Sequence, residues 1–198
     1  MSWDDWRDRL APVGGAYAEE EAVNLYHLAW QTPWDLWIVE VGSYRGFSGM
    51  TLAAGSLARP VPRLALVDVW GMEPFRIEDR HPQVGMVENI GELLRQANEV
   101  GLMERLFLLR MQSVHAATVW PAGARIGLLH IDAEHTYEAL TQDVASWQKH
   151  LVPGAKMVVH DYWPEPYPGV VQAMDEIRQQ PGWHDWSLIR TQVTMRYQ

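Results

Sequence analysis

The segment between residues 126 and 162 constrains the fold of this chain more than any other part of the sequence. An apolar run at 126–131 ends in Asp132, an amphipathic helix follows, and a Pro153-Gly154 turn leads into a second apolar run that ends in His160-Asp161. This order predicts a strand–helix–strand unit whose two strands lie parallel and side by side. Neighbouring strands are about 5 Å apart. We therefore expect Asp132 and Asp161 to converge at the sheet edge where open α/β folds bind ligands.

The composition is that of one globular domain. With 198 residues, of which 47% are hydrophobic, the chain can bury a sizeable core. The lack of cysteine excludes a disulfide framework and thiolate metal sites, and it fits a cytoplasmic protein. The formal net charge of −9 argues against a nucleic-acid partner. No apolar run approaches the length of a membrane span, so no membrane partner is expected.

Apolar runs and amphipathic stretches alternate along the rest of the chain. Further strands are predicted at residues 36–41, 63–69, 105–111, 183–189 and 192–197. Helices are predicted at residues 15–31, 48–57, 84–100, 114–119 and 169–180, with a polar loop at 71–83. The pattern indicates an α/β fold, a Rossmann-like doubly wound and mostly parallel seven-stranded sheet with a C-terminal antiparallel strand. Residues 35–198 would form this domain, and residues 1–34 an N-terminal helical segment that serves as a lid or an oligomer contact.

The turn after the first predicted strand has the features of a cofactor site. Its sequence is Glu40-Val41-Gly42-Ser43-Tyr44-Arg45-Gly46-Phe47-Ser48. The two glycines permit positive φ or a close approach to a ligand, and the following helix offers free amides. The spacing differs from Gly-x-Gly-x-x-Gly and lacks the lysine of a P-loop. Asp68 ends the second strand, 22 residues beyond Gly46, where a carboxylate suits both hydroxyls of a ribose.

Taken together, these motifs resemble class I S-adenosylmethionine-dependent methyltransferases. The resemblance is to the small group with Ile-Asp-x-x-His-x-Tyr-Glu, here residues 131–138, and a following His-Asp-Tyr, here residues 160–162. That group includes sugar O-methyltransferases of antibiotic pathways and cephalosporin-hydroxylase-like proteins. The resemblance runs from about residue 36 to residue 162. It implies S-adenosylmethionine as the cofactor.

The resemblance also implies which residues contact that cofactor. Glu40, Gly42 and Gly46 would line its methionine and ribose side, and Asp68 would hold the ribose hydroxyls. Near the adenine the resemblance places Trp70, Gln112 and Ser113, and next to the reactive methyl group it places Asp132. The complete set of cofactor residues is Glu40, Gly42, Ser43, Tyr44, Gly46, Ser48, Asp68, Val69, Trp70, Gln112, Ser113 and Asp132.

A divalent cation is a further implication, because several sugar methyltransferases of the group bind magnesium through acidic residues after these strands. The matching ligands are Asp132, His160 and Asp161, with His160 where an acid is often found. Since Mg²⁺ prefers oxygen ligands, the histidine weakens that metal, selects a softer one such as Mn²⁺ or Zn²⁺, or indicates a metal-free site. The predicted catalytic residues are Asp132, His135 and Asp161, with His135 or His160 accepting the proton. A purely structural role is an equally good interpretation for each histidine.

The predicted function is O-methylation of a small molecule, such as a sugar, a glycosylated metabolite or a phenol. Tyr162, Trp163 and Tyr167 would surround this acceptor, because aromatic faces suit sugars and rings. Trp3 and Trp6 suggest a lid or a homo-oligomer contact. Two alternatives stay open: a catalytically inactive methyltransferase-like binding domain, and an NAD-dependent oxidoreductase, which the glycine spacing disfavours.

Overall fold

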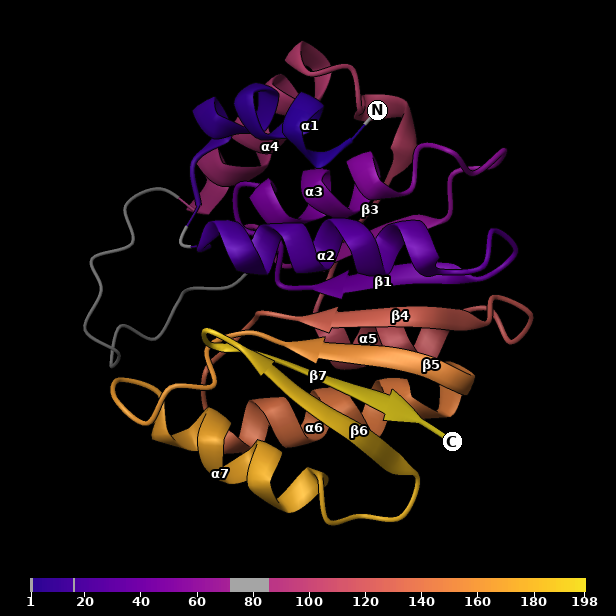
Figure 1. The fold of residues 1–198 in the computed structure, drawn as a ribbon, viewed down its shortest axis with the longest axis vertical. Helices are drawn as coiled ribbons and strands as arrows, with labels where there is room; N and C mark the ends of the chain where they lie inside the picture. The colour runs from indigo at the N-terminus through magenta and orange to yellow at the C-terminus, as the bar shows by residue number, and fades with distance from the viewer. Residues whose placement is uncertain (1, 16, 72–85) are drawn as a thin grey trace.

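One sheet organises the molecule. The computed structural model describes residues 2–15, 17–71 and 86–198, so the predicted loop at 71–83 and the start of the helix predicted at 84–100 lie almost wholly outside the described residues. Within these residues seven strands form the sheet (Figure 1), in the order β3-β2-β1-β4-β5-β7-β6. They are β1 (Trp37–Val41), β2 (Leu64–Asp68), β3 (Leu106–Arg110), β4 (Ile126–Ile131), β5 (Leu151–Val159), β6 (Trp183–Ile189) and β7 (Gln192–Tyr197).

The direction of the strands confirms the predicted fold class. β1 pairs in parallel with β2 and β4, β2 with β3, and β4 with β5. β7 pairs antiparallel with both β5 and β6. The chain is therefore a Rossmann-like α/β fold with a mostly parallel sheet and an antiparallel C-terminal strand. All five parallel strands end at one edge of the sheet, and the candidate site lies there.

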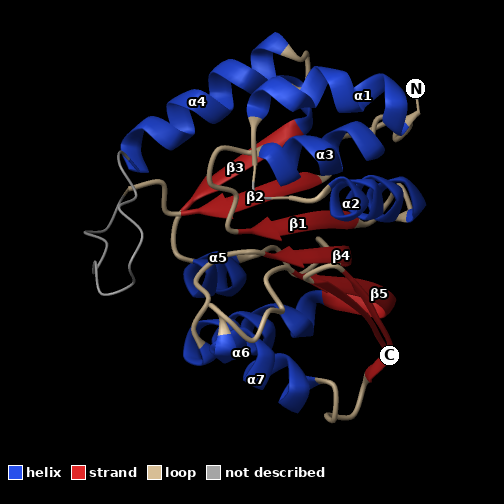
Figure 2. Cartoon of the chain, turned by 60° about the vertical axis from the view of Figure 1, so that its left-hand side comes forward, coloured by secondary structure: helices blue, strands red, loops and turns tan. Residues whose placement is uncertain are grey.

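Helices cover both faces of the sheet (Figure 2). On one face lie α1 (Trp3–Leu10), α2 (Glu19–Gln31), α3 (Phe47–Gly55) and α4 (Met86–Glu99), and on the other α5 (Ser113–Val119), α6 (Tyr137–Trp147) and α7 (Pro168–Ile177). Short 3₁₀ turns are η1 (Ala11–Val13), η2 (Met103–Arg105) and η3 (Gln148–His150). Successive strand residues face opposite layers, so Ile38 packs with the first group and Val39 with the second. This two-sided burial explains why the parallel strands read as continuous apolar runs.

The Pro153-Gly154 prediction is wrong. These residues do not reverse the chain but lie inside β5, and the reversal occurs earlier, at η3. The register between β4 and β5 shifts there, since Ile126 opposes Leu151 and Leu128 opposes Lys156. Proline lacks a ladder donor and glycine takes φ +89°, and both properties suit a bulge. The helix predicted from residue 15 also begins later, at Glu19, because Ala18 is extended.

Gly42 allows β1 and β4 to end side by side. Its φ is +83°, and a Cβ atom there would lie 2.1 Å from the carbonyl oxygen of Asp132. The neighbouring backbone therefore requires a glycine at this position, and the predicted contact of Gly42 with the cofactor stays a prediction. Its amide donates to Val67, and the Asp132 amide donates to Val41. Within the described residues no helix combines the length and apolar character needed to cross a membrane.

We predict that Gly42→Ala destabilises the protein by about 3 kcal/mol or more, since it adds both an unfavourable φ and a backbone clash. Gly154→Ala is the matched control, because Gly154 has φ +89° and a Cβ atom added there would meet no other atom within 4 Å. That variant carries only the backbone penalty of about 1–2 kcal/mol. Urea unfolding of both variants measures the difference, and equal losses would contradict the close approach to Asp132.

Candidate active site

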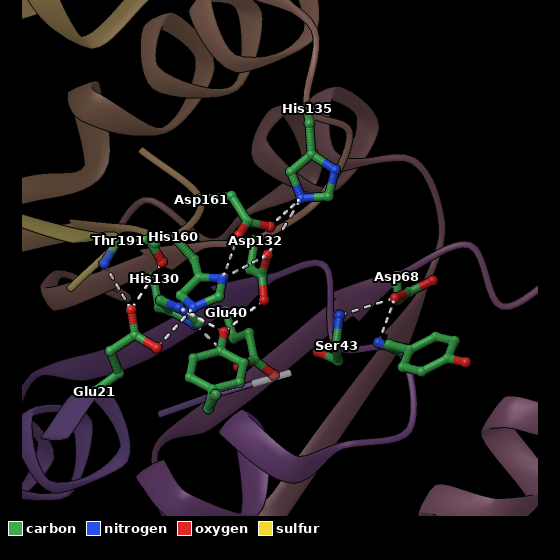
Figure 3. A network of polar contacts seen from close by, with 12 residues as sticks. Glu21, Glu40, Ser43, Asp68, His130, Asp132, His135, His160, Asp161 and Thr191 are labelled. Atoms are coloured by element: carbon green, nitrogen blue, oxygen red, sulfur yellow. Dashed lines mark hydrogen bonds and ion pairs between the residues drawn. The ribbon is translucent and has the colours of Figure 1, made fainter. Parts of the chain in front are cut away.

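Two aspartates meet a histidine at the carboxyl edge of the sheet (Figure 3). Asp132 directly follows β4, and Asp161 lies two residues beyond β5. Nε2 of His135 lies 2.9 Å from Oδ2 of Asp161 and 3.5 Å from Oδ1 of Asp132. One potential ligand atom from each of the three side chains lies within 4.8 Å of the others. The predicted convergence of the two carboxylates is confirmed.

Local packing holds His135 in this position. Thr136, the next residue, caps α6 through its side chain, which fixes the chain direction immediately after the histidine. The imidazole stacks on the Tyr167 ring with 4.2 Å between ring centroids. Gly169 makes this stacking possible, because a Cβ there would lie 2.6 Å from a backbone nitrogen at the start of α6. The loop after β5 therefore packs directly against His135 through Tyr167.

His160 lies behind the two aspartates, on the side of α2. Its Nδ1 lies 3.4 Å from Oδ1 of Asp161 and 3.6 Å from Oδ1 of Asp132, and its side chain is 3% exposed. Asp161 itself has φ +61°, a strained conformation typical of functional positions. The potential metal-ligand group contains His135 in place of His160. His135 is therefore a further candidate ligand, and the set of Asp132, His160 and Asp161 predicted from the sequence stays a prediction.

Glu21, at the start of α2, binds the far nitrogen of His160. Its Oε2 lies 3.3 Å from Nε2 of His160 and accepts the amide of Ala18 at 2.9 Å. Its Oε1 accepts both the amide and the hydroxyl of Thr191, at 2.9 Å and 2.8 Å. Sequence reasoning missed Glu21, because an acidic first turn is also what any helix favours. One buried carboxylate thus ties α2 to the end of β5 and to the β6–β7 turn.

A second set of buried polar contacts connects Asp132 to Glu40 through Tyr17 and His130. The hydroxyl of Tyr17 donates to Oδ2 of Asp132 at 2.5 Å and lies 3.3 Å from Nε2 of His130. Nδ1 of His130 lies 3.0 Å from Oε1 of Glu40, and both of these side chains are fully buried. His130 thus lies between Glu40 and Tyr17 in this set of contacts. One carboxylate oxygen of Glu40 is paired with His130. The predicted contact of Glu40 with the cofactor stays a prediction.

Opposite charges outweigh burial in setting the protonation of this cluster. Burial opposes charging, but contacts with the two aspartates raise the pKa of His135 to about 9 and, with Glu21, that of His160 to about 12. Burial likewise opposes ionisation of Asp132 and Asp161, yet contacts with the two imidazoles lower both pKa values. Near neutral pH both histidines are protonated. Neither can accept a proton in this charge state before it loses its own.

The turn after β1 is shaped by Asp68. One carboxylate oxygen accepts the amides of Ser43 and Tyr44 at 2.8 Å and 2.9 Å, and the other accepts the amide of Trp70 at 2.8 Å. Gly46 has φ +90° and caps α3. The acid at the end of β2 and the turn after β1 therefore lie together, as the cofactor hypothesis requires. Ribose binding by Asp68 stays a prediction.

Several of the remaining predicted cofactor residues are buried or hydrogen-bonded to other parts of the protein. The Trp70 side chain is 1% exposed, and its indole donates to the carbonyl of Tyr44 at 2.9 Å. The Ser113 hydroxyl accepts the indole of Trp147 at 2.9 Å. Ser48 is buried. Val69 and Gln112 follow β2 and β3 at the carboxyl edge of the sheet, where the cofactor is expected. The cofactor contacts of all these residues stay predictions.

The three aromatic residues predicted around an acceptor separate into different environments. Tyr167 stacks on His135, as described above, and Trp163 is 53% exposed in the same loop. The Tyr162 hydroxyl instead donates to Asp175 at 3.1 Å, and its ring contacts Trp186. Tyr162 is thus held toward α7 and β6. Trp163 and Tyr167 remain the better candidates for contact with an acceptor.

The donor set of the site fits a small divalent cation. Asp132 and Asp161 offer carboxylate oxygens and His135 offers one nitrogen, all within reach of one ion. Mg²⁺ favours the oxygens, and a single imidazole is compatible with Mn²⁺ or Zn²⁺. All three side chains are partly exposed, so an ion could reach them.

The parallel strands bring the glycine turn after β1, Asp68 at the end of β2 and the acid–histidine cluster after β4 and β5 to one edge of the sheet, as the methyltransferase resemblance predicts. Residues 39–162 match a family model described as a methyltransferase domain. Because this match covers more than half of the chain, the protein belongs to that methyltransferase-domain family.

Solved structures show the same fold at low sequence identity. The O-methyltransferase TomG from Streptomyces achromogenes, in complex with S-adenosylmethionine, has a TM-score of 0.70 and 14% identity, over 96% of this chain and 89% of that chain. NovP, an O-methyltransferase, has a TM-score of 0.67 and 18% identity, over 90% and 79%. CalS11, a TDP-rhamnose 3′-O-methyltransferase of calicheamicin biosynthesis, has a TM-score of 0.61 and 17% identity, over 98% and 93%. At these identities the likeness establishes the fold alone.

Glu21 predicts a specific dependence of stability on pH. Burial raises its pKa, but hydrogen bonds from His160, Ala18 and Thr191 lower it to about 2, below its ordinary 4.5. A lowered pKa stabilises the fold above pH 4.5, and this stabilisation is lost as the pH falls toward 2. We expect Glu21→Gln to cost about 3 kcal/mol at pH 7 and progressively less below pH 4.5.

Urea unfolding from pH 7 to pH 3 measures this difference. Glu20→Gln is the matched control, because the neighbouring Glu20 is exposed and its neutralisation should change the unfolding free energy little at any pH. A Glu21→Gln penalty that is small at neutral pH, or that grows in acid, would contradict the assignment.

Proposed function

We propose that this protein is an S-adenosylmethionine-dependent O-methyltransferase that acts on a hydroxyl group of a small molecule. One observation carries the proposal: the turn after β1 and the acid–histidine cluster are adjacent, since Gly42 packs against the backbone of Asp132. A donor bound along the turn and Asp68 would present its methyl group to that cluster. The fold likeness to TomG, solved with S-adenosylmethionine, and to the sugar methyltransferase CalS11 supports the same assignment.

The chemistry is an in-line displacement. The acceptor oxygen attacks the methyl carbon, the carbon–sulfur bond breaks, and neutral S-adenosylhomocysteine leaves. The hydroxyl proton passes to His135 after that imidazole has released its own proton to solvent. Holding the three reacting atoms in line supplies most of the acceleration. The ionised carboxylates of Asp132 and Asp161 orient the hydroxyl and favour positive charge nearby, including the sulfonium of the donor.

A divalent cation is the finer part of the proposal. Asp132, His135 and Asp161 would hold it, and it would supply a positive charge that lowers the pKa of the acceptor hydroxyl. Two carboxylates and one imidazole favour Mn²⁺ or Mg²⁺ over metals that require thiolates. In the charge state described above, the imidazolium of His135 already occupies the space between the two carboxylates. The cation and the proton on His135 would therefore exclude each other.

An acceptor with a flat face suits the open side of the site. Trp163 is exposed there and Tyr167 lies against His135, so a sugar ring or an aromatic ring can rest on these side chains. A small phenol, a sugar or a glycosylated metabolite meets this description.

We expect the protein to bind S-adenosylhomocysteine and not NAD⁺ in calorimetry. Asp68→Asn should raise the dissociation constant of S-adenosylhomocysteine about 10- to 100-fold, because a charged acceptor of ribose hydroxyls is lost. Asp35→Asn, an exposed position before β1 at the opposite edge, is the control and should leave the affinity unchanged. Preferential binding of NAD⁺ would favour the oxidoreductase alternative, and an unaffected Asp68→Asn variant would remove Asp68 from the cofactor site.

We further expect Asp132→Asn to lower kcat for methyl transfer at least about 100-fold, since it disturbs both orientation and proton removal. The affinity for S-adenosylhomocysteine should change less than about threefold, which corresponds to about 0.6 kcal/mol. Mass spectrometry of reactions with phenol and sugar acceptors, with and without Mg²⁺ or Mn²⁺, measures the transfer. Wild-type turnover in a folded Asp132→Asn variant would refute the role of this residue. Cofactor binding with no turnover in the wild type would favour the inactive binding domain.

A further inference from the structure

Tyr17 reaches the centre of the site from outside the matched methyltransferase domain. It lies in the extended segment before α2, and residues 39–162 are those of the family match. Its ring stacks on His160 with 4.2 Å between centroids and contacts Phe47 at 5.7 Å. Its hydroxyl donates to Oδ2 of Asp132 at 2.5 Å. The N-terminal segment therefore supplies a direct partner of the central carboxylate.

The proton inventory fixes the direction of this contact. A tyrosine hydroxyl has one proton, and the carboxylate of Asp132 is the stronger and nearer acceptor, at 2.5 Å against 3.3 Å for Nε2 of His130. A hydrogen bond from a hydroxyl to an ionised carboxylate is among the stronger kinds in proteins. Tyr17 and Asp132 are thus joined by a short, charge-assisted bond.

This bond decides which oxygen of Asp132 faces the reaction. Oδ2 is held by Tyr17, so Oδ1 is directed toward His135 at 3.5 Å and His160 at 3.6 Å. Without the hydroxyl, the carboxylate could rotate about its terminal torsion, which is a soft one. A misplacement of about 1 Å can cost on the order of 100-fold in rate.

We propose that Tyr17 is a positioning residue of the methyltransferase site, acting through Asp132. The proposal rests on the proposed function for its effect on rate, but the contact itself can be tested without turnover. Tyr17 orients Oδ1 of Asp132 toward the acceptor side, in the way that outer-shell partners orient catalytic or metal-binding side chains. Its hydroxyl acts on the carboxylate of the acceptor half, while its ring packs against Phe47 at the end of the cofactor turn and its hydroxyl also contacts Ser48.

The experiment is a double-mutant cycle with Tyr17→Phe, Asp132→Asn and the double variant. Tyr17→Phe retains the ring contacts with His160 and Phe47 and removes only the hydroxyl. We expect the changes in the unfolding equilibrium constant, measured in urea, to deviate from additivity at least about tenfold. A cooperative unfolding curve verifies that each variant is folded.

The catalytic arm uses the same variants. Tyr17→Phe should lower kcat about 10- to 100-fold and change the dissociation constant of S-adenosylhomocysteine less than about threefold. In the Asp132→Asn background it should have no further effect on single-turnover methyl transfer. Tyr137→Phe is the matched control, because its hydroxyl also donates to a carboxylate, that of Glu176 at 2.6 Å. That variant should retain wild-type kcat.

The outcomes separate the two proposals. Additive unfolding changes, or an active enzyme whose kcat is insensitive to Tyr17→Phe, would overturn the positioning role while leaving the methyltransferase assignment intact. A wild-type protein without cofactor binding or turnover would overturn the proposed function. In that case the unfolding cycle still decides whether Tyr17 fixes Asp132.

Discussion

Two carboxylates at one end of neighbouring strands repel each other, and this repulsion determines what must stand beside them. Parallel pairing of β4 and β5 leaves little freedom in the separation of Asp132 and Asp161. Both are partly buried, where an unpaired charge is costly. Positive groups are therefore required at the site, and His135 and His160 supply them from two sides. The rest of the edge is arranged around these two imidazoles, with Tyr167 against one and Glu21 against the other.

The central pair of the site was predictable because its cause is local and topological. An apolar run that ends in an acid, a helix, and a second such run dictate parallel neighbours whose ends coincide. No distant information was needed for Asp132 and Asp161. The same reasoning placed Asp68 beside the turn after β1, because β1 and β2 are also parallel neighbours. The prediction of a turn at Pro153-Gly154 was wrong. Both residues favour turns, but the pairing of β5 with β4 and β7 keeps them within the strand, at a bulge.

The partners of this pair could not be predicted, because their contacts span most of the chain. Tyr17 is 115 residues from Asp132, and Glu21 is 139 residues from His160 and 170 from Thr191. No spacing in a sequence encodes such contacts. The place of His135 beside the two aspartates and the contact of His160 with Glu21 could not be read from the sequence for the same reason. Both depend on which side of the aspartates α2 covers, and the N-terminal segment decides that.

The two halves of the site therefore differ in origin. The turn after β1 with Asp68 is built within the matched domain, whereas the acceptor half depends on Tyr17 and Glu21 from residues 1–34. Tyr17 and Glu21 are direct partners of Asp132 and His160, and removing one partner of a buried charge pair costs several kcal/mol. We infer that the N-terminal segment belongs to the same folding unit as the sheet. The segment supplies contacts that the charges of the site need, and its predicted role as a lid or an oligomer contact stays a prediction.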